Sequence, residues 1–248
     1  MNSNHTLTFY WHDYETFGLS PAKDRPAQFA GVRTDMDFNP IGAPLMVYCK
    51  PMPDYLPSPE SCLITGITPQ LCLDKGIAEP QFAQAIHREL AAPETIGVGY
   101  NSLRFDDEVT RFMFWRNFYP PYKREYENNC SRWDIIDVVR CAYALRPEGI
   151  EFPVDETTGR VSLRLEKLSA ANGLTHDAAH DALSDVHATI ALAKLLKTQQ
   201  PRLFDFALKM RLKANVQDEI GYPYDHSKSP KAFLHISGMF GAERRYLA

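Results

Sequence analysis

The order of the predicted strands and helices constrains the fold of this chain more than any other feature of its sequence. Three segments rich in β-branched and aromatic residues open the chain, at residues 6–12, 27–35 and 45–50. A short apolar strand is predicted at residues 96–100, and helical spacing of apolar residues dominates the remainder. We therefore predict an α/β fold in which a mixed β-sheet, opened by an antiparallel meander, is flanked by helices.

Apolar residues at helical spacing and turn-forming residues indicate where the helices begin and end. Helices are expected at residues 79–91, 106–117, 134–145, 164–172, 182–197 and 203–213. Residues 51–59 contain four prolines and are predicted to form an extended loop. Thr68 and Pro69 resemble a helix N-cap followed by proline at the first helical position. We predict a first domain over residues 1–200, with a linker helix and the start of a second domain over residues 201–248.

The cysteines and the absence of long apolar runs indicate where the protein acts. The five cysteines are odd in number, and none has Cys-x-x-Cys spacing, which favours reduced thiols in the cytoplasm. The N-terminus has neither the basic start nor the apolar stretch of a signal peptide. No apolar run reaches the ~20 residues that a membrane helix needs. We expect a cytoplasmic monomer without a membrane partner.

The net charge of −4 neither indicates nor excludes a nucleic-acid partner. Residues 1–200 contain 19 Lys and Arg against 26 Asp and Glu, whereas residues 201–248 contain 8 against 5. An enzyme that holds metal ions between carboxylates is acidic at its active site, and the bound cations reverse that local charge. The composition gives no support to a protein that coats duplex DNA.

Two carboxylates follow the first predicted strand directly. Asp13 and Glu15 lie two residues apart in the segment HDYETFG. Side chains at i and i+2 of a strand point to the same side, so both carboxylates can reach one metal ion. The alternative is an exposed strand end with two solvated acids.

Two further acidic motifs come later in the chain. Asp106 opens a predicted helix after the apolar strand, where an acid also has the simpler role of complementing the helix dipole. His180 and Asp185 lie five residues apart around the start of a late helix. With an ordinary pKa near 6.5, a histidine beside metal-binding acids is suited to accept a proton from water.

The segment from His176 to His180 has a second interpretation. These two histidines have the i, i+4 spacing of a zinc hydrolase helix, with Asp where a metalloprotease has Glu. Asn172 and Gly173 predict a turn just before this segment, and the zinc interpretation leaves the earlier acids unexplained.

Taken in order, the motifs are Asp-x-Glu, then Asp, then His followed by Asp five residues later. This order resembles the DEDD exonucleases of the histidine-bearing type, which have an RNase H-like fold. The chain more closely resembles the bacterial exodeoxyribonuclease I family, from about residue 9 to residue 242. The resemblance is carried by the segments HDYETFG, DRPAQFA, LITGITP, GYNSLRFDDEVTR, NNCSRWD, CAYALRPEGI, AHDALSDV and KTQQPRLFD.

The resemblance implies a nuclease of DNA repair and recombination that degrades single-stranded DNA from the 3′ end to 5′-mononucleotides. It implies two Mg²⁺ ions, for which Mn²⁺ can substitute, bound by Asp13, Glu15, Asp106 and Asp185. His180 is then expected to act as the general base towards the attacking water.

The resemblance also implies positions that contact DNA or a partner. The expected DNA contacts are Glu15, Phe17, Leu63, Ile64, Thr65, Phe105, Arg132 and Trp133. Core packing is the alternative for Phe17, Leu63, Ile64, Thr65 and Phe105, and a salt bridge beside a buried tryptophan is the alternative for Arg132 and Trp133. Arg146 matches a family position associated with docking the acidic tail of single-strand DNA-binding protein.

The chain departs from the family after Ala242, where family members continue into an SH3-like domain and a helical domain. We expect residues 201–248 to include only a short C-terminal remnant of the SH3-like domain. Two alternatives to an active deoxyribonuclease stay open. One is a fragment that binds single strands with little or no turnover, and the other is a 3′→5′ exoribonuclease of the same superfamily.

Overall fold

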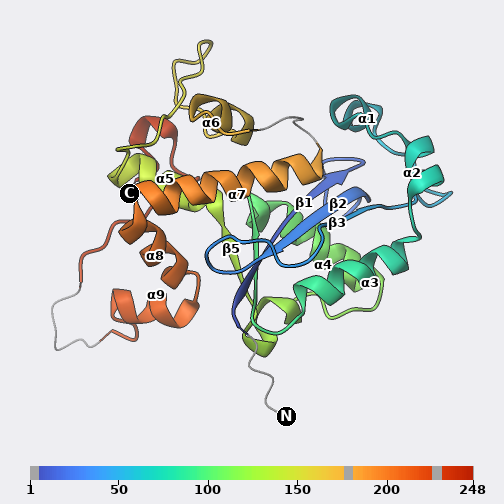
Figure 1. The fold of residues 1–248 in the computed structure, drawn as a ribbon, viewed down its shortest axis with the longest axis horizontal. Helices are drawn as coiled ribbons and strands as arrows, with labels where there is room; N and C mark the ends of the chain where they lie inside the picture. Colours follow the sequence, from blue (N-terminus) through green and yellow to red (C-terminus); the bar gives the residue numbers. More distant parts are fainter. Residues whose placement is uncertain (1–5, 176–180, 225–230, 248) are drawn as a thin grey trace. The chain divides into compact units, whose positions relative to one another are not determined.

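The computed structural model describes residues 6–175, 181–224 and 231–247, and a five-stranded mixed sheet lies in the first of its two compact units (Figure 1). Its strands are β1 Thr8–Thr16, β2 Pro26–Thr34, β3 Leu45–Tyr48, β4 Thr95–Gly99 and β5 Ser131–Asp134. Their order across the sheet is β3-β2-β1-β4-β5. The first three strands pair antiparallel, whereas β4 and β5 run parallel to β1 and to each other. The predicted mixed sheet and its opening meander are confirmed.

Nine α-helices occur in the described part of the chain. They are α1 Pro59–Thr65, α2 Pro69–Lys75, α3 Glu79–Leu90, α4 Asp106–Arg116, α5 Ile135–Leu145, α6 Leu165–Ala171, α7 Ala182–Gln199, α8 Pro201–Met210 and α9 Lys213–Ile220. The first five helices predicted from apolar spacing agree with α3 to α7 within two residues at each end. The predicted cap of α2 is confirmed, because the Thr68 side chain accepts a hydrogen bond from the Leu71 N–H.

The sequence did not predict α1, α9 or β5. Helix α1 begins where the proline-rich loop ends, with Ser58 as N-cap and Pro59 at the first helical position. The helix predicted at residues 203–213 instead begins at Pro201, because proline again suits the first turn, and it ends at Met210. Strand β5 has only four residues, too few for a periodic pattern.

The chain divides into two compact units. The first comprises Met1–Asp134 and His176–Ile190, and the second comprises Ile135–Thr175 and Ala191–Ala248. The division falls inside α7, whereas the sequence places a boundary at residue 200. The predicted domain extents, 1–200 and 201–248, stay a prediction.

The sheet of the first unit alternates its side chains between two faces. Tyr10 and Tyr14 point to the face that packs against α3 and α4, where an aromatic and aliphatic core forms. Phe9 and Trp11 point to the other face, and the Phe9 ring stacks on Trp133 with centroids 6.1 Å apart. This second face also carries the next two alternate positions of β1, which are acidic.

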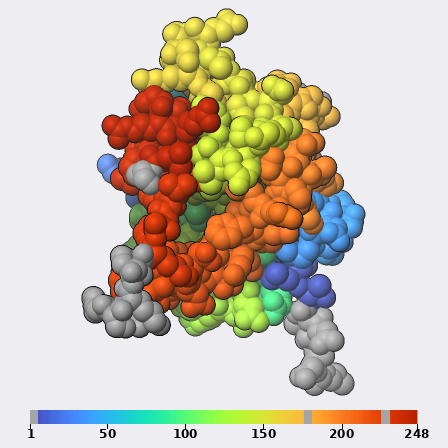
Figure 2. Space-filling view, turned by 90° about the vertical axis from the view of Figure 1, so that its left-hand side faces the viewer, coloured from blue at the N-terminus to red at the C-terminus, as the bar shows by residue number. Residues whose placement is uncertain are grey.

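In the second unit, α5 buries apolar residues and contacts α8. The C-terminal segment, residues 231–247, lies beside α5 in Figure 2, and the Tyr246 ring packs against Tyr143 with centroids 6.2 Å apart. An isolated bridge joins Ile236 to Leu247 in this segment. The expected remnant of an SH3-like domain stays a prediction. In the described part of the chain, no helix has the length and apolar character needed to cross a membrane.

Candidate active site

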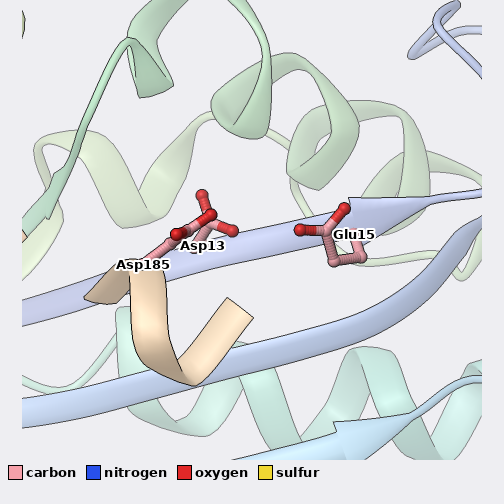
Figure 3. Close-up of side chains that lie close together, drawn as sticks. All are labelled: Asp13, Glu15 and Asp185. Carbon is pink, nitrogen blue, oxygen red and sulfur yellow. The ribbon is translucent and has the colours of Figure 1, made fainter. Parts of the chain in front are cut away.

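The site begins with the acidic positions of β1. This strand extends to Thr16, so Asp13 and Glu15 lie inside it and not, as predicted, just after its end. Both side chains point to the same face, because they are two residues apart in a strand. Asp185 reaches them from the first turn of α7 (Figure 3). One carboxylate oxygen from each of the three residues lies within 4.8 Å of the others.

Asp106 adds a fourth carboxylate beside this group. It is the first residue of α4 and is only 4% exposed. Its Oδ1 accepts a hydrogen bond of 3.1 Å from the backbone N–H of Tyr14, the residue between the two acids of β1. Helix α4 is therefore attached to the strand at the point where the acids meet.

These carboxylates are difficult to ionise in the absence of a cation. Burial raises the pKa of Asp13 well above its usual value, and repulsion from Asp106 and the other nearby acids raises it further. Burial also raises the pKa of Glu15 to about 8, with contributions from Asp185 and Asp181. A positive charge among these groups favours their ionised forms. The donor set consists of oxygen atoms, which suits a hard divalent cation such as Mg²⁺ or Mn²⁺.

The residue after Asp106 has a different role. Asp107 is 1% exposed and accepts hydrogen bonds from Arg124 at 2.5 Å and Arg132 at 2.9 Å. Burial alone would raise its pKa, but Arg124, His12 and Arg132 outweigh burial and hold the pKa of Asp107 below its usual value. The pKa values of the adjacent residues Asp106 and Asp107 are thus shifted in opposite directions, because Asp106 is buried near other acids whereas Asp107 bonds to arginines.

The predicted general base lies outside the described residues. His180 and His176 both belong to the segment 176–180, so neither the catalytic role nor the zinc interpretation is tested by the structure. Asp181, the next described residue, lies at the start of α7 and hydrogen bonds to Gln28 of β2. Sequence reasoning missed both of these residues. Asp181 precedes a helical pattern, which is an N-cap signal, but nothing in the sequence distinguishes Gln28.

Three of the expected DNA contacts lie on or near the surface of α1. Leu63 is 84% exposed and Ile64 is 62% exposed, which is unusual for large apolar side chains. Thr65 is half-buried, and its hydroxyl accepts from the Ile67 N–H and donates to the Ser61 carbonyl. Leu63 and Ile64 therefore have the exposure that contact with a ligand requires.

Of four further expected DNA contacts, Phe17 and Trp133 are buried and Phe105 and Arg132 are partly buried. Phe17 is buried in a small core with Ile67, and Phe105 packs beside the α3 and α4 core. Trp133 is 5% exposed, so its ring offers no free face to a base. Arg132 pairs with Asp107 at 2.9 Å and with Glu125 at 3.0 Å. The surroundings of these side chains fit the alternative interpretation, core packing and a salt bridge beside a buried tryptophan.

Arg146 lies in the second unit, where it is exposed at the end of α5. It borders a pocket of about 490 Å³. The pocket is lined by Leu145, Arg146, Gln200, Pro201, Arg202, Leu203 and Phe206. Two arginines beside apolar side chains suit a ligand that has both a negative charge and an apolar group.

Comparison with known proteins gives consistent results. A family model described as "Exonuclease" matches residues 10–193. Exodeoxyribonuclease I of Escherichia coli is 55% identical over 237 residues, which are 96% of this chain and 49% of that protein. The crystal structure of E. coli exonuclease I with a dA16 oligonucleotide has a TM-score of 0.90 and 52% identity, covering 98% of this chain and 51% of that one. A structure described as an ExoI/SSB-Ct complex has a TM-score of 0.91 and 52% identity, with the same shares covered. The chain thus spans about half the length of the relatives it matches.

Proposed function

The chain belongs to the exonuclease family, and on that premise we propose that it hydrolyses single-stranded DNA from the 3′ end to 5′-mononucleotides. The observation that carries the proposal is the group of three carboxylates from β1 and α7, with oxygen atoms within 4.8 Å of one another. The similarity to an exonuclease I bound to an oligonucleotide supports DNA as the substrate.

In this proposal Asp13, Glu15, Asp106 and Asp185 hold two divalent cations, Mg²⁺ in the first place with Mn²⁺ as a substitute. When bound, the cations supply a Lewis acid for the phosphate and lower the pKa of water. The four carboxylates would hold the cations through their oxygen atoms and their negative charge. His180 accepts the proton of the attacking water as general base.

For the substrate, Leu63 and Ile64 of α1 are proposed to contact the terminal base. Their exposure of 84% and 62% leaves apolar surface available for stacking with a base, which has a π-face in every nucleotide. Thr65 and Glu15 are proposed to contribute polar contacts. Phe17, Phe105, Arg132 and Trp133 are the remaining proposed DNA contacts, with core packing and a salt bridge beside a buried tryptophan as the alternative.

The partner proposed for the pocket at Arg146 is the acidic tail of single-strand DNA-binding protein. The similarity to the ExoI/SSB-Ct complex supports this partner, and Arg146 and Arg202 provide positive charge beside Leu203 and Phe206. We further propose that the protein acts as a monomer in the cytoplasm, where the five free cysteines would stay reduced.

The test is a digestion of 5′-labelled single-stranded DNA by the purified chain with Mg²⁺. Asp13→Ala, Asp185→Ala and an EDTA sample serve as controls. The proposal expects a ladder that shortens from the 3′ end and is lost in all three controls. Intact DNA with measurable binding would instead support a fragment that binds without turnover. Faster degradation of a matched RNA would support the exoribonuclease alternative.

A further inference from the structure

A buried glutamine joins the two elements that carry the carboxylates. Gln28 lies on β2 directly opposite Glu15 of β1, and it is only 1% exposed. Its amide nitrogen donates to Asp181 Oδ1 at 3.1 Å, and its amide oxygen accepts from the Ala182 N–H at 3.2 Å. The start of α7 is therefore held by a side chain of the sheet.

Asp181 extends this contact into the first turn of α7. Its Oδ2 accepts from the Ser184 N–H at 3.2 Å, so Asp181 caps the helix. Its backbone carbonyl accepts from the Asp185 N–H at 3.0 Å. One carboxylate thus bonds to the sheet with one oxygen and to the helix with the other, one turn before Asp185.

The contact requires an amide at position 28. The Ala182 N–H donates and Asp181 Oδ1 accepts, so their common partner presents an acceptor and a donor side by side, as an amide does. The same two partners determine which atom of the Gln28 amide is nitrogen and which is oxygen. The second amide hydrogen points towards Met46 Sδ at 3.6 Å.

We propose that Gln28 is a positioning residue that fixes the start of α7, and with it Asp185, against the carboxylates of β1. The inference rests on the proposed function, because it assigns Gln28 a role at the same metal site. A metal ion at this site needs oxygen atoms from both β1 and α7. Residues that orient metal ligands through hydrogen bonds strongly influence metal affinity. In this proposal Gln28 acts on the site through Asp181 and Ala182 and not by contact with the substrate; its side chain also lies against Met46 and Tyr48 of β3.

Gln28→Met tests this role, because methionine has a similar length but cannot donate a hydrogen bond and accepts one only weakly through its sulfur. The affinity of the full chain for Mn²⁺, measured by calorimetry without DNA, is expected to fall by about 10- to 100-fold. The nuclease activity at low Mn²⁺ is expected to fall similarly and to recover in part at high Mn²⁺. Gln84→Met, at an exposed position of α3, is the matched control and is expected to bind Mn²⁺ as the wild type does.

A double-mutant cycle separates positioning from a general loss of stability. Asp181→Ser keeps a residue that can cap α7 but removes the carboxylate that meets Gln28. If Gln28 acts in part through Asp181, the double variant loses less Mn²⁺ affinity than the product of the two single losses, because Asp181→Ser leaves only the bond to the Ala182 N–H for Gln28→Met to remove. Thermal unfolding without metal shows whether each variant is folded. If Gln28→Met does not fold, Asp181→Ser, which leaves β2 unchanged, gives the same readout.

Two results would overturn the positioning role. One is a Gln28→Met protein that binds Mn²⁺ within about twofold of the wild type and the Gln84→Met control. Such a change is much smaller than the loss expected for a residue that orients a metal ligand. The other is a double variant whose loss equals the product of the two single losses, because independent effects add in free energy. A wild type that binds Mn²⁺ but degrades no DNA would contradict the proposed function instead.

Discussion

At the residue scale, the carboxylates of the site lie close enough to repel one another. Asp13, Glu15 and Asp185 hold their carboxylate oxygens within 4.8 Å of one another, and burial raises the pKa values of the two acids on β1. Such an arrangement is unfavourable in the absence of a cation. A substitution that removes one carboxylate should therefore harm metal binding without harming the fold.

Asp13→Asn is the sharpest test of this view. We expect the nuclease activity to fall at least about 100-fold, since a direct ligand matters more than the residues behind it. We also expect the metal-free variant to unfold at the same temperature as the wild type or at a higher one, because repulsion with Asp106 and Glu15 is relieved. Steady-state digestion and thermal unfolding in EDTA measure the two effects. A clear drop in the unfolding temperature would contradict the electrostatic account.

Among the secondary structure elements, α3 and α4 are joined by an ion pair beside their shared core. Glu79, the first residue of α3, accepts hydrogen bonds from Arg116 at 2.6 and 2.9 Å and from Asn117 at 2.8 Å. Burial alone would raise the pKa of Glu79, but its bonds with Arg116 and Asn117 outweigh burial and lower it. Because Asp106 begins α4, this pair helps hold the helix that brings the fourth carboxylate.

Glu79→Gln should lower the free energy of unfolding at pH 7 by about 1.5–3 kcal/mol, the range for hydrogen bonds to charged groups. The folded pKa of Glu79 is lowered, so its stabilisation is full above the unfolded value of about 4.3 and is lost as the pH falls through the folded value. The difference between wild type and variant should therefore shrink below about pH 5. Urea unfolding at several pH values, with exposed Glu60→Gln as control, measures it. A difference that stays constant down to pH 3 would contradict the ion pair as its source.

At the scale of the whole molecule, the two compact units have separate proposed tasks. The first contains the carboxylates, and the second contains the pocket at Arg146. Each task can therefore be tested without changing the other.

Binding of metal should stabilise the native chain, because the unfolded chain does not hold its carboxylates together. A ligand present at 100 times its dissociation constant stabilises by about 2.7 kcal/mol, which corresponds to a rise in unfolding temperature of roughly 5–10 °C for a chain of this size. We expect this rise with Mg²⁺ or Mn²⁺, its reversal by EDTA and its absence in Asp185→Asn. Differential scanning fluorimetry provides the measurement. An equal rise in Asp185→Asn would place the metal elsewhere.

Charge reversal at the pocket should affect the partner and leave the chemistry intact. Arg146→Glu is expected to weaken binding of a peptide with an acidic, apolar C-terminus by at least about tenfold, because like charges facing each other cost several kcal/mol. Digestion of DNA without the partner should be unchanged. Arg160→Glu, at an exposed position of the same unit, is the control. Fluorescence anisotropy of the labelled peptide measures binding, and equal affinity for both variants would remove Arg146 from the proposed site.

The sequence by itself determined the features that depend on neighbouring residues. The spacing of Asp13 and Glu15 predicts a shared face because a strand alternates its side chains, and Thr68 predicts the start of α2 because capping is local. The mixed sheet follows from the order of elements. The family resemblance selected Asp185 and Asp106, and for Asp106 the local pattern leaves a dipole-complementing role and chemistry both open.

Only the tertiary structure decided which distant residues meet. It brought Asp185 to β1 and attached Asp106 to the Tyr14 backbone, and no local pattern contains those contacts. It left Leu63 exposed but enclosed Trp133, although the sequence treats both as candidates for stacking with DNA. Gln28 is the clearest case, since its partner lies 153 residues away. Burial and hydrogen-bond partners are properties of the packed chain, and they distinguish a residue that meets a ligand from one that supports it.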